Sequence, residues 1–206
     1  FTLPATGRHD LNTLTEAELE QQFLELDRRA VWAALVATFA FFSAASGMWA
    51  FIERMGAQRG FSAEAIGNLL AVSLIAATCG SLMTAWLGKR FGNTQPFAFT
   101  CGLFLLALYL LAGEAAFFVY ALGAGVLTFA IGMGLPFAIA EVARLDSDGR
   151  FVILSVPAIG FGAMLGPAAA GTLAESGSFT LVLIVAGGAI LTGLAAMLIA
   201  RAIHGD

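Results

Sequence analysis

A single carboxylate, Glu53, ends a helical stripe of aromatic and polar residues. The members of the stripe recur at spacings of three and four residues: Phe39, Phe42, Ser46, Trp49 and Glu53. These spacings place the side chains on one face of a helix. If that face lines a cavity, Glu53 can hydrogen-bond a solute or take up and release a proton. Otherwise Glu53 lies beside Arg54 at a helix end, and Trp49 anchors that end where apolar and polar surroundings meet.

A second set of candidate residues follows in the uncharged run 115–140. Tyr120, Thr128, Phe129 and Met133 offer aromatic and weakly polar side chains that could form a cavity wall. Packing against neighbouring helices accounts for each of them equally well. Uncharged walls of this kind favour an uncharged, aromatic or amphipathic solute, or one whose charge is bound elsewhere.

The composition indicates the surroundings of these residues. Of 206 residues, 59% are hydrophobic and 12% are charged, about half the charged fraction of a soluble domain, which is roughly 25%. So few charges cannot cover a surface in water, and we therefore predict a membrane protein. The basic residues are scattered one or two per loop, which gives no support to nucleic-acid binding.

Catalysis within the bilayer has little support in the sequence. It would need paired aspartates, a zinc-binding histidine pair, or a serine with a histidine. Both histidines, His9 and His204, lie in the polar ends, and no apolar run contains an aspartate. We therefore expect no enzyme, no metal site and no cofactor.

Six uncharged runs divide the sequence. Each is near the ~20 residues that an α-helix needs to cross ~30 Å of hydrocarbon. They cover residues 30–52, 65–88, 91–113, 115–140, 151–174 and 176–200. We expect an all-α membrane protein with a bundle of six transmembrane helices over residues 30–200.

The basic residues predict the orientation of this bundle. Lys and Arg in short loops are retained on the cytoplasmic side. With both ends of the chain in the cytoplasm, only Arg54 and Arg59 of the ten basic residues lie outside. We therefore expect a multi-pass protein of the cell (inner or plasma) membrane, with a cytoplasmic linker at 1–29 and a cytoplasmic tail at 201–206. Within the linker, Thr15–Glu18 fits a capping box and predicts a short amphipathic helix.

Glycine and proline set the fourth and fifth runs apart from the others. Gly162 and Gly166 form a GxxxG pair, which lets helix backbones approach closely. The full set of expected packing and hinge residues is Gly132, Gly134, Pro136, Gly160, Gly162, Gly166, Pro167 and Gly171. Between these runs, the charged stretch 141–150 is expected to be either a solvated loop or a cytoplasmic gate latch.

The loop between the second and third runs resembles a signature of the major facilitator superfamily. It reads Gly88-Lys89-Arg90-Phe91-Gly92-Asn93. It matches the family pattern at Gly88, Arg90, Phe91 and Gly92. Lys89 replaces an acid of that pattern, and Asn93 replaces its last base. Residues 49–56 and the glycines after Arg150 are similar to the family's seventh and eleventh helices, so the resemblance covers about residues 28–200.

This resemblance implies the C-terminal six-helix half of a secondary transporter that works by alternating access. The first and fourth spans would line the central cavity, the second and fifth would face an N-terminal six-helix half, and the third and sixth would face lipid. The solute would be a small organic molecule, driven by the gradient of a proton or of the substrate. The alternative is a self-contained six-helix binding or scaffolding protein that acts as a homodimer, which an upstream reading frame encoding six more spans would remove.

The cavity-facing hypothesis for Glu53 is testable in the intact transporter. Glu53→Gln keeps the side-chain size and removes the titratable proton, so it is expected to alter the pH dependence of uptake or efflux. Transport assays over a range of pH measure this, and an unchanged profile would remove Glu53 from the mechanism.

Overall fold

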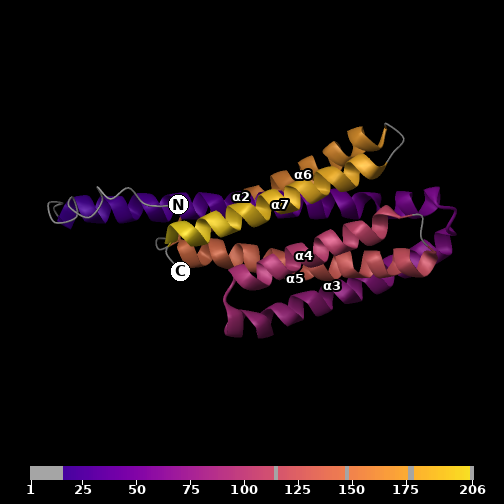
Figure 1. Cartoon of the computed structure of the whole chain (residues 1–206), viewed down its shortest axis with the longest axis horizontal. Helices are drawn as coiled ribbons and strands as arrows, with labels where there is room; N and C mark the ends of the chain where they lie inside the picture. Colours follow the sequence, from indigo (N-terminus) through magenta and orange to yellow (C-terminus); the bar gives the residue numbers. More distant parts are fainter. Residues whose placement is uncertain (1–15, 114–115, 147–148, 176–178, 205–206) are drawn as a thin grey trace.

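The computed structural model describes residues 16–113, 116–146, 149–175 and 179–204, and every regular element in these ranges is helical. Six helices are long and apolar enough to cross a membrane, as expected, which fits a multi-pass membrane protein. Figure 1 shows α2 (Glu16–Gln58), α3 (Ala63–Phe91), α4 (Thr94–Ala112), α5 (Phe117–Leu145), α6 (Ser155–Ala174) and α7 (Phe179–His204). A short 3-10 helix, η1 (Val152–Leu154), precedes α6.

The first helix is much longer than the uncharged run that it contains. α2 has 43 residues, or about 65 Å at 1.5 Å per residue. It joins the expected amphipathic segment and the first span without a break. Thr15, the expected N-cap, lies outside the described residues. Of the expected tail at 201–206, residues 201–204 continue α7, and residues 205–206 lie outside the described residues.

The connection between the second and third spans is a tight turn. α3 ends at Phe91, and the C-cap Gly92 has a φ of 68°, a left-handed conformation that glycine adopts without strain. α4 then begins at Thr94, three residues after the start of the third uncharged run. The loop that resembles the family signature therefore lies mostly within the last turns of α3.

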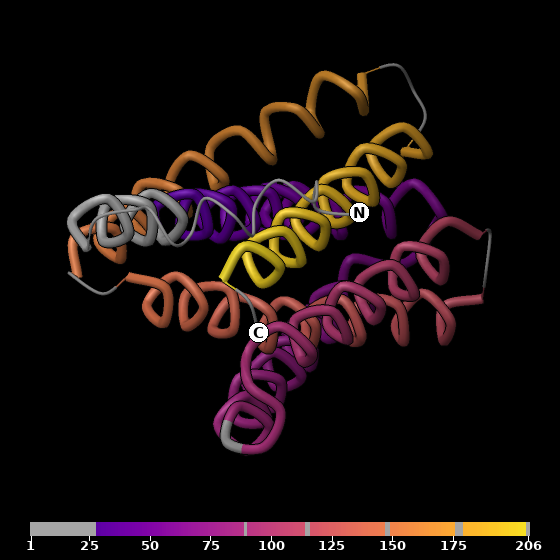
Figure 2. Tube along the Cα trace, turned by 60° about the vertical axis from the view of Figure 1, so that its left-hand side comes forward, coloured from indigo at the N-terminus to yellow at the C-terminus, as the bar shows by residue number. Residues whose placement is uncertain are grey.

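The six spans pair in a pattern that repeats. α2 packs most extensively against α6 and α7, and α5 packs likewise against α3 and α4. α2 also contacts α5, and α4 contacts α7, whereas the α3–α4 and α6–α7 contacts are slight. The same pattern of contacts results when α2 is exchanged with α5, α3 with α6 and α4 with α7. The chain thus forms two three-helix units, one of α2, α6 and α7 and the other of α5, α3 and α4. The helices α3 and α6 lie at opposite edges of the bundle (Figure 1 and Figure 2).

The α2–α6 contact brings two helix backbones together. A Cβ added at Gly166 would lie 2.2 Å from the carbonyl oxygen of Ser43, and one at Gly162 would lie 3.1 Å from the Ser43 nitrogen. Ser46 Oγ donates a hydrogen bond of 2.9 Å to the Gly162 carbonyl. The expected GxxxG pair therefore lies at this interface, where glycine is needed for close approach.

The α3–α5 contact is built in the same way. A Cβ at Gly132 would lie 2.0 Å from the Ala77 carbonyl oxygen, and one at Gly80 would lie 2.2 Å from the Phe129 carbonyl oxygen. Ser81 Oγ donates a hydrogen bond of 2.9 Å to the Gly132 carbonyl. Both outer helices, α3 and α6, are thus held to a central helix by backbone contact and by a hydroxyl–carbonyl bond.

The centre of the bundle is aromatic. The Phe41 ring of α2 has its centroid 5.5 Å from that of Phe97 and 5.8 Å from that of Phe104, both on α4. A Cβ at Gly134 would lie 2.3 Å from the Phe41 ring, so this glycine makes room for the ring. Of the other expected packing and hinge residues, Gly160 faces open space and Gly171 is loosely packed, while Pro136 and Pro167 lie inside helices that continue past them.

The two edge helices are the most exposed spans. Only 22% of the most apolar window of α3 and 17% of that of α6 are buried, against 39% or more in the other four. The third and sixth spans, which the sequence suggests face lipid, are buried on one side by their contacts with α5, with α2 and with each other. The surface with fewest partners within this chain therefore belongs to α3 and α6.

Close backbone packing predicts opposite effects for two glycines of α5. Gly132→Ala is expected to lower stability by about 1–3 kcal/mol, because its Cβ overlaps the Ala77 carbonyl. Gly125→Ala is the matched control, because nothing lies within 4 Å of its Cβ position and alanine is the better helix former. Unfolding in mixed detergent micelles measures both variants. Equal stability of the two variants would contradict the packing described here.

Candidate functional site

A cavity of about 290 Å³ lies where the two three-helix units meet. α2 supplies four of its lining residues, and the others come from α3, α5 and α6. The lining consists of Phe42, Ala45, Ser46, Trp49, Leu74, Ala77, Thr128, Ile131 and Ala163. The cavity therefore lies between the two backbone-packed pairs, α2–α6 and α3–α5.

The sequence of α2 explains why the middle of its predicted stripe lines this cavity, whereas Phe39 lines a separate cavity. Phe42, Ser46 and Trp49 share one helix face. A different face carries Phe41, Met48 and other side chains that are fully buried in the bundle core. α2 thus divides its residues between packing and the cavity, as expected for a central helix with two environments.

The polar groups of the cavity are hydroxyls and one indole. Ser46 Oγ donates to the Gly162 carbonyl at 2.9 Å, and Thr128 Oγ1 donates to the Ala124 carbonyl at 3.0 Å. With their protons committed to the backbone, both hydroxyls offer the cavity acceptor lone pairs. Trp49 is 38% exposed, and its indole N–H is a donor only. None of the residues that line the cavity is ionisable.

Four of the eight predicted cavity residues lie in this lining: Phe42, Ser46, Trp49 and Thr128. Glu53 does not; it is exposed, one turn beyond Trp49 on α2. Met133 is fully buried in the core, and Phe129 packs against that core. Met133 and Phe129 therefore lie outside the cavity lining, Met133 within the core and Phe129 against it.

Tyr120 has a packing environment at the opposite end of α5 from the charged loops. Its hydroxyl donates to the Ile52 carbonyl of α2. The Arg59 guanidinium lies 5.0 Å from the centre of the Tyr120 ring and donates to the Leu111 carbonyl, near the end of α4. A cation is favourable at a helix C-terminus. Arg59 and Tyr120 therefore connect the ends of α2, α4 and α5.

Sequence reasoning missed the lining residues on the edge helices. Leu74 and Ala77 of α3 and Ala163 of α6 are apolar residues in apolar runs. The only available signal was the enrichment of small residues around Gly80 and Gly162, which marks the faces that approach the central helices. Whether a residue on such a face lines the cavity depends on how the four helices cross.

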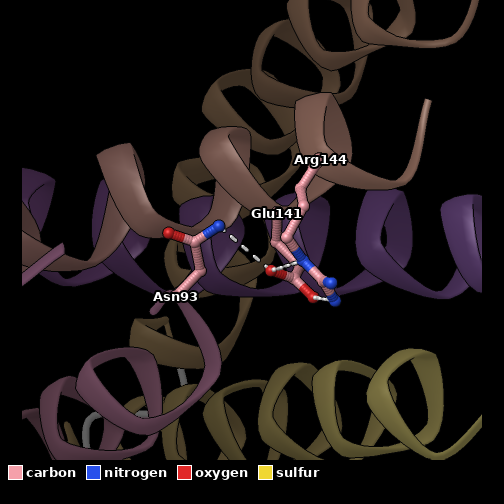
Figure 3. A network of polar contacts seen from close by, with 3 residues as sticks. All are labelled: Asn93, Glu141 and Arg144. Carbon is pink, nitrogen blue, oxygen red and sulfur yellow. Dashed lines mark hydrogen bonds and ion pairs between the residues drawn. The ribbon is translucent and has the colours of Figure 1, made fainter. Parts of the chain in front are cut away.

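A buried carboxylate lies at the other end of the bundle. Glu141 is 1% exposed and receives two hydrogen bonds from Arg144, of 2.8 Å to Oε1 and 3.2 Å to Oε2. Asn93 Nδ2 donates to the same Oε2 at 3.1 Å (Figure 3). Glu141 and Arg144 belong to the last turns of α5, so this part of the stretch 141–150 is helical rather than a solvated loop. The network ties the α3–α4 turn to the end of α5.

The other residues of the signature loop lie near this network. The Arg90 guanidinium lies 5.7 Å from the centre of the Trp86 ring, a cation–π contact on the exposed side of α3. A Cβ at Gly88 would lie 3.6 Å from the Phe137 ring, and Gly92 forms the turn described above. The side chain of Lys89 lies outside the described part of the chain.

No protein-family model and no curated protein sequence matches this chain.

The burial of Glu141 predicts an asymmetric response to mutation. Arg144→Leu leaves a buried carboxylate with one neutral donor and is expected to destabilise the protein by about 2 kcal/mol or more. Glu141→Gln leaves Arg144 able to reach solvent and is expected to lower the stability by less. Unfolding in mixed micelles compares the two. A larger loss for Glu141→Gln would show that the carboxylate does not depend on this ion pair.

Proposed function

We propose that this chain is the C-terminal half of a secondary transporter of the major facilitator superfamily type. It moves a small organic solute across the cell membrane by alternating access, driven by the gradient of a proton or of the solute. Its partner is an N-terminal six-helix half. The observation that carries the proposal is the cavity between α2, α3, α5 and α6, which lies beside the two least buried helices.

The pairing of the helices supports this assignment. Transporter halves of this type consist of two three-helix repeats in inverted orientation. Here the contacts of α2, α3 and α4 are repeated by α5, α6 and α7. Because two spans, α3 and α4, lie between them, α2 and α5 run in opposite directions (Figure 1). An inverted three-plus-three arrangement is the one expected for a half-transporter.

The exposed faces of α3 and α6 support a partner on the side of the cavity. Besides large apolar residues, they present small side chains such as Ala71 and Thr78 on α3, and Gly160 and Ala168 on α6. Small residues favour close helix–helix packing in a membrane. A second six-helix half against these two helices would enclose the cavity between two bundles.

Rigid pairs suit a rocking mechanism. α6 and α3 are each fixed to a central helix through backbone contacts and hydroxyl bonds. The Glu141 network fixes the α3–α4 turn to α5 in addition. We therefore propose that the half moves as one body against its partner. In this mechanism the network maintains the shape of the cytoplasmic end, or exchanges bonds as a latch with the other half.

Charge at the two ends supports cytoplasmic termini. Arg90, Arg144 and Arg201 lie at one end of the bundle, where α3, α5 and α7 finish and α2 enters the membrane. Arg54 and Arg59 lie at the other end. Because basic residues are retained in the cytoplasm, the end with Arg144 is assigned to the cytoplasm.

Alternating access predicts a conformation-dependent exposure of the aromatic stripe. In a Cys79→Ser background, Phe42→Cys, Ser46→Cys and Trp49→Cys are expected to react with a membrane-impermeant maleimide to different extents in inward-open and outward-open states. Tyr109→Cys is the control. Its labelling is expected to be the same in both states, because Tyr109 is 75% exposed on α4 and belongs to the proposed lipid face. Protection of all three cavity sites in every state of the intact transporter would contradict the proposal.

A further inference from the structure

We infer that this cavity binds an uncharged aromatic group that carries one polar substituent. The inference rests on the proposed function, because it names the class of solute that this half of the transporter recognises. It is carried by the size of the cavity, by its uncharged lining and by two aromatic rings that have no ring partner among the described residues.

The size of the cavity admits more than one ring. An apolar cavity of about 150 Å³ in a protein core binds benzene, and this cavity measures about 290 Å³. The space therefore suits a bicyclic ring system. Because side chains of α2, α3, α5 and α6 all line it, a bound ring system would touch all four helices.

The lining excludes a charge. No lining residue is ionisable, and an ion placed among apolar side chains without a counter-ion loses its hydration. The nearest carboxylate along α2, that of Glu53, is exposed and belongs to the next turn. The part of the solute that enters this cavity is therefore neutral.

The aromatic rings of the lining are available to a ligand. Some aromatic rings of the described chain pair with one another, as Phe41 does with Phe97 and Phe61 with Tyr120. Phe42 and Trp49 take part in none of the ring contacts of the described residues. Ring–ring contacts favour an aromatic over a saturated ligand of the same shape.

The polar groups select a single substituent. Among the described residues, the Trp49 indole N–H has no acceptor, so it can donate to a hydroxyl or carbonyl oxygen of the ligand. Ser46 and Thr128 have used their protons and can only accept. A hydroxyl group, which donates and accepts, satisfies both kinds of partner.

The test measures the binding of four matched probes to the intact transporter, this chain together with its N-terminal half, in lipid nanodiscs. The probes are 2-naphthol, naphthalene, 2-naphthoate and decahydro-2-naphthol, with empty nanodiscs as the blank for partition into lipid. Isothermal titration calorimetry is expected to detect one saturable site for 2-naphthol. Decahydro-2-naphthol should bind roughly three- to tenfold more weakly, and 2-naphthoate more than tenfold more weakly.

Three variants assign the binding to the cavity. Ala163→Leu adds bulk to the lining and should abolish saturable binding, whereas Ala168→Leu, an exposed position on the same helix, should not. Trp49→Phe keeps a ring and removes the N–H, so it should weaken 2-naphthol roughly three- to tenfold more than it weakens naphthalene. A purely structural role of Trp49 would weaken both probes equally.

The outcomes separate this inference from the proposed function. Tighter binding of 2-naphthoate, saturable binding that Ala163→Leu leaves unchanged, or no saturable binding of 2-naphthol would overturn the solute class. If the stripe still changed its accessibility between transport states, the transporter proposal would stand without this solute class. Cavity binding of 2-naphthol without any change of accessibility would instead support the ligand class and contradict alternating access.

Discussion

In the hydrocarbon of a membrane, an apolar helix gains little by exchanging lipid for the apolar side of another helix, so association depends on close contact and on polar bonds between helices. This chain meets that constraint with glycine and serine. Gly162 and Gly166 let α6 touch the backbone of α2, and Gly132 does the same for α3 and α5. The hydroxyls that cross each contact add bonds in surroundings without competing water. The rest of the architecture follows from these two pairs.

The cavity lies between the two helix pairs that pack closely through small residues. Close contact holds each outer helix to one central helix, and the ring of Phe41 on α2 packs against Phe97 and Phe104 of α4. Between the two pairs the lining combines Phe42 and Trp49 with alanines, which leave space. The same serine that fastens α2 to α6 therefore also supplies a polar atom to the cavity. One stripe of α2 thus contributes both to packing and to the cavity lining.

Charge is confined to the ends of the bundle, and there it has a structural role. At one end Arg59 joins the ends of three helices through the Tyr120 ring and the Leu111 carbonyl. At the other end the buried Glu141 is surrounded by donors from Arg144 and Asn93. Asn93 lies where the signature that this loop resembles has a base, and its amide donates to the Glu141 carboxylate. A neutral donor avoids adding a second cation beside Arg144, which already neutralises the carboxylate.

The sequence by itself determined the helices and their number, because a run of about 20 uncharged apolar residues has few alternatives to a membrane-spanning helix. It also determined which side chains of α2 share a face, since spacings of three and four fix this. The tertiary structure decided the rest. Glu141 and Arg144 were visible as neighbours at a spacing of three, but only the approach of the α3–α4 turn buries the carboxylate. Tyr120 and Met133 fit a cavity wall as well as a core, and the crossing of α5 with α2 and α4 placed them in packing. Leu74 and Ala163 became lining residues for the same reason: periodicity fixes the faces of one helix, whereas a cavity depends on how several helices cross.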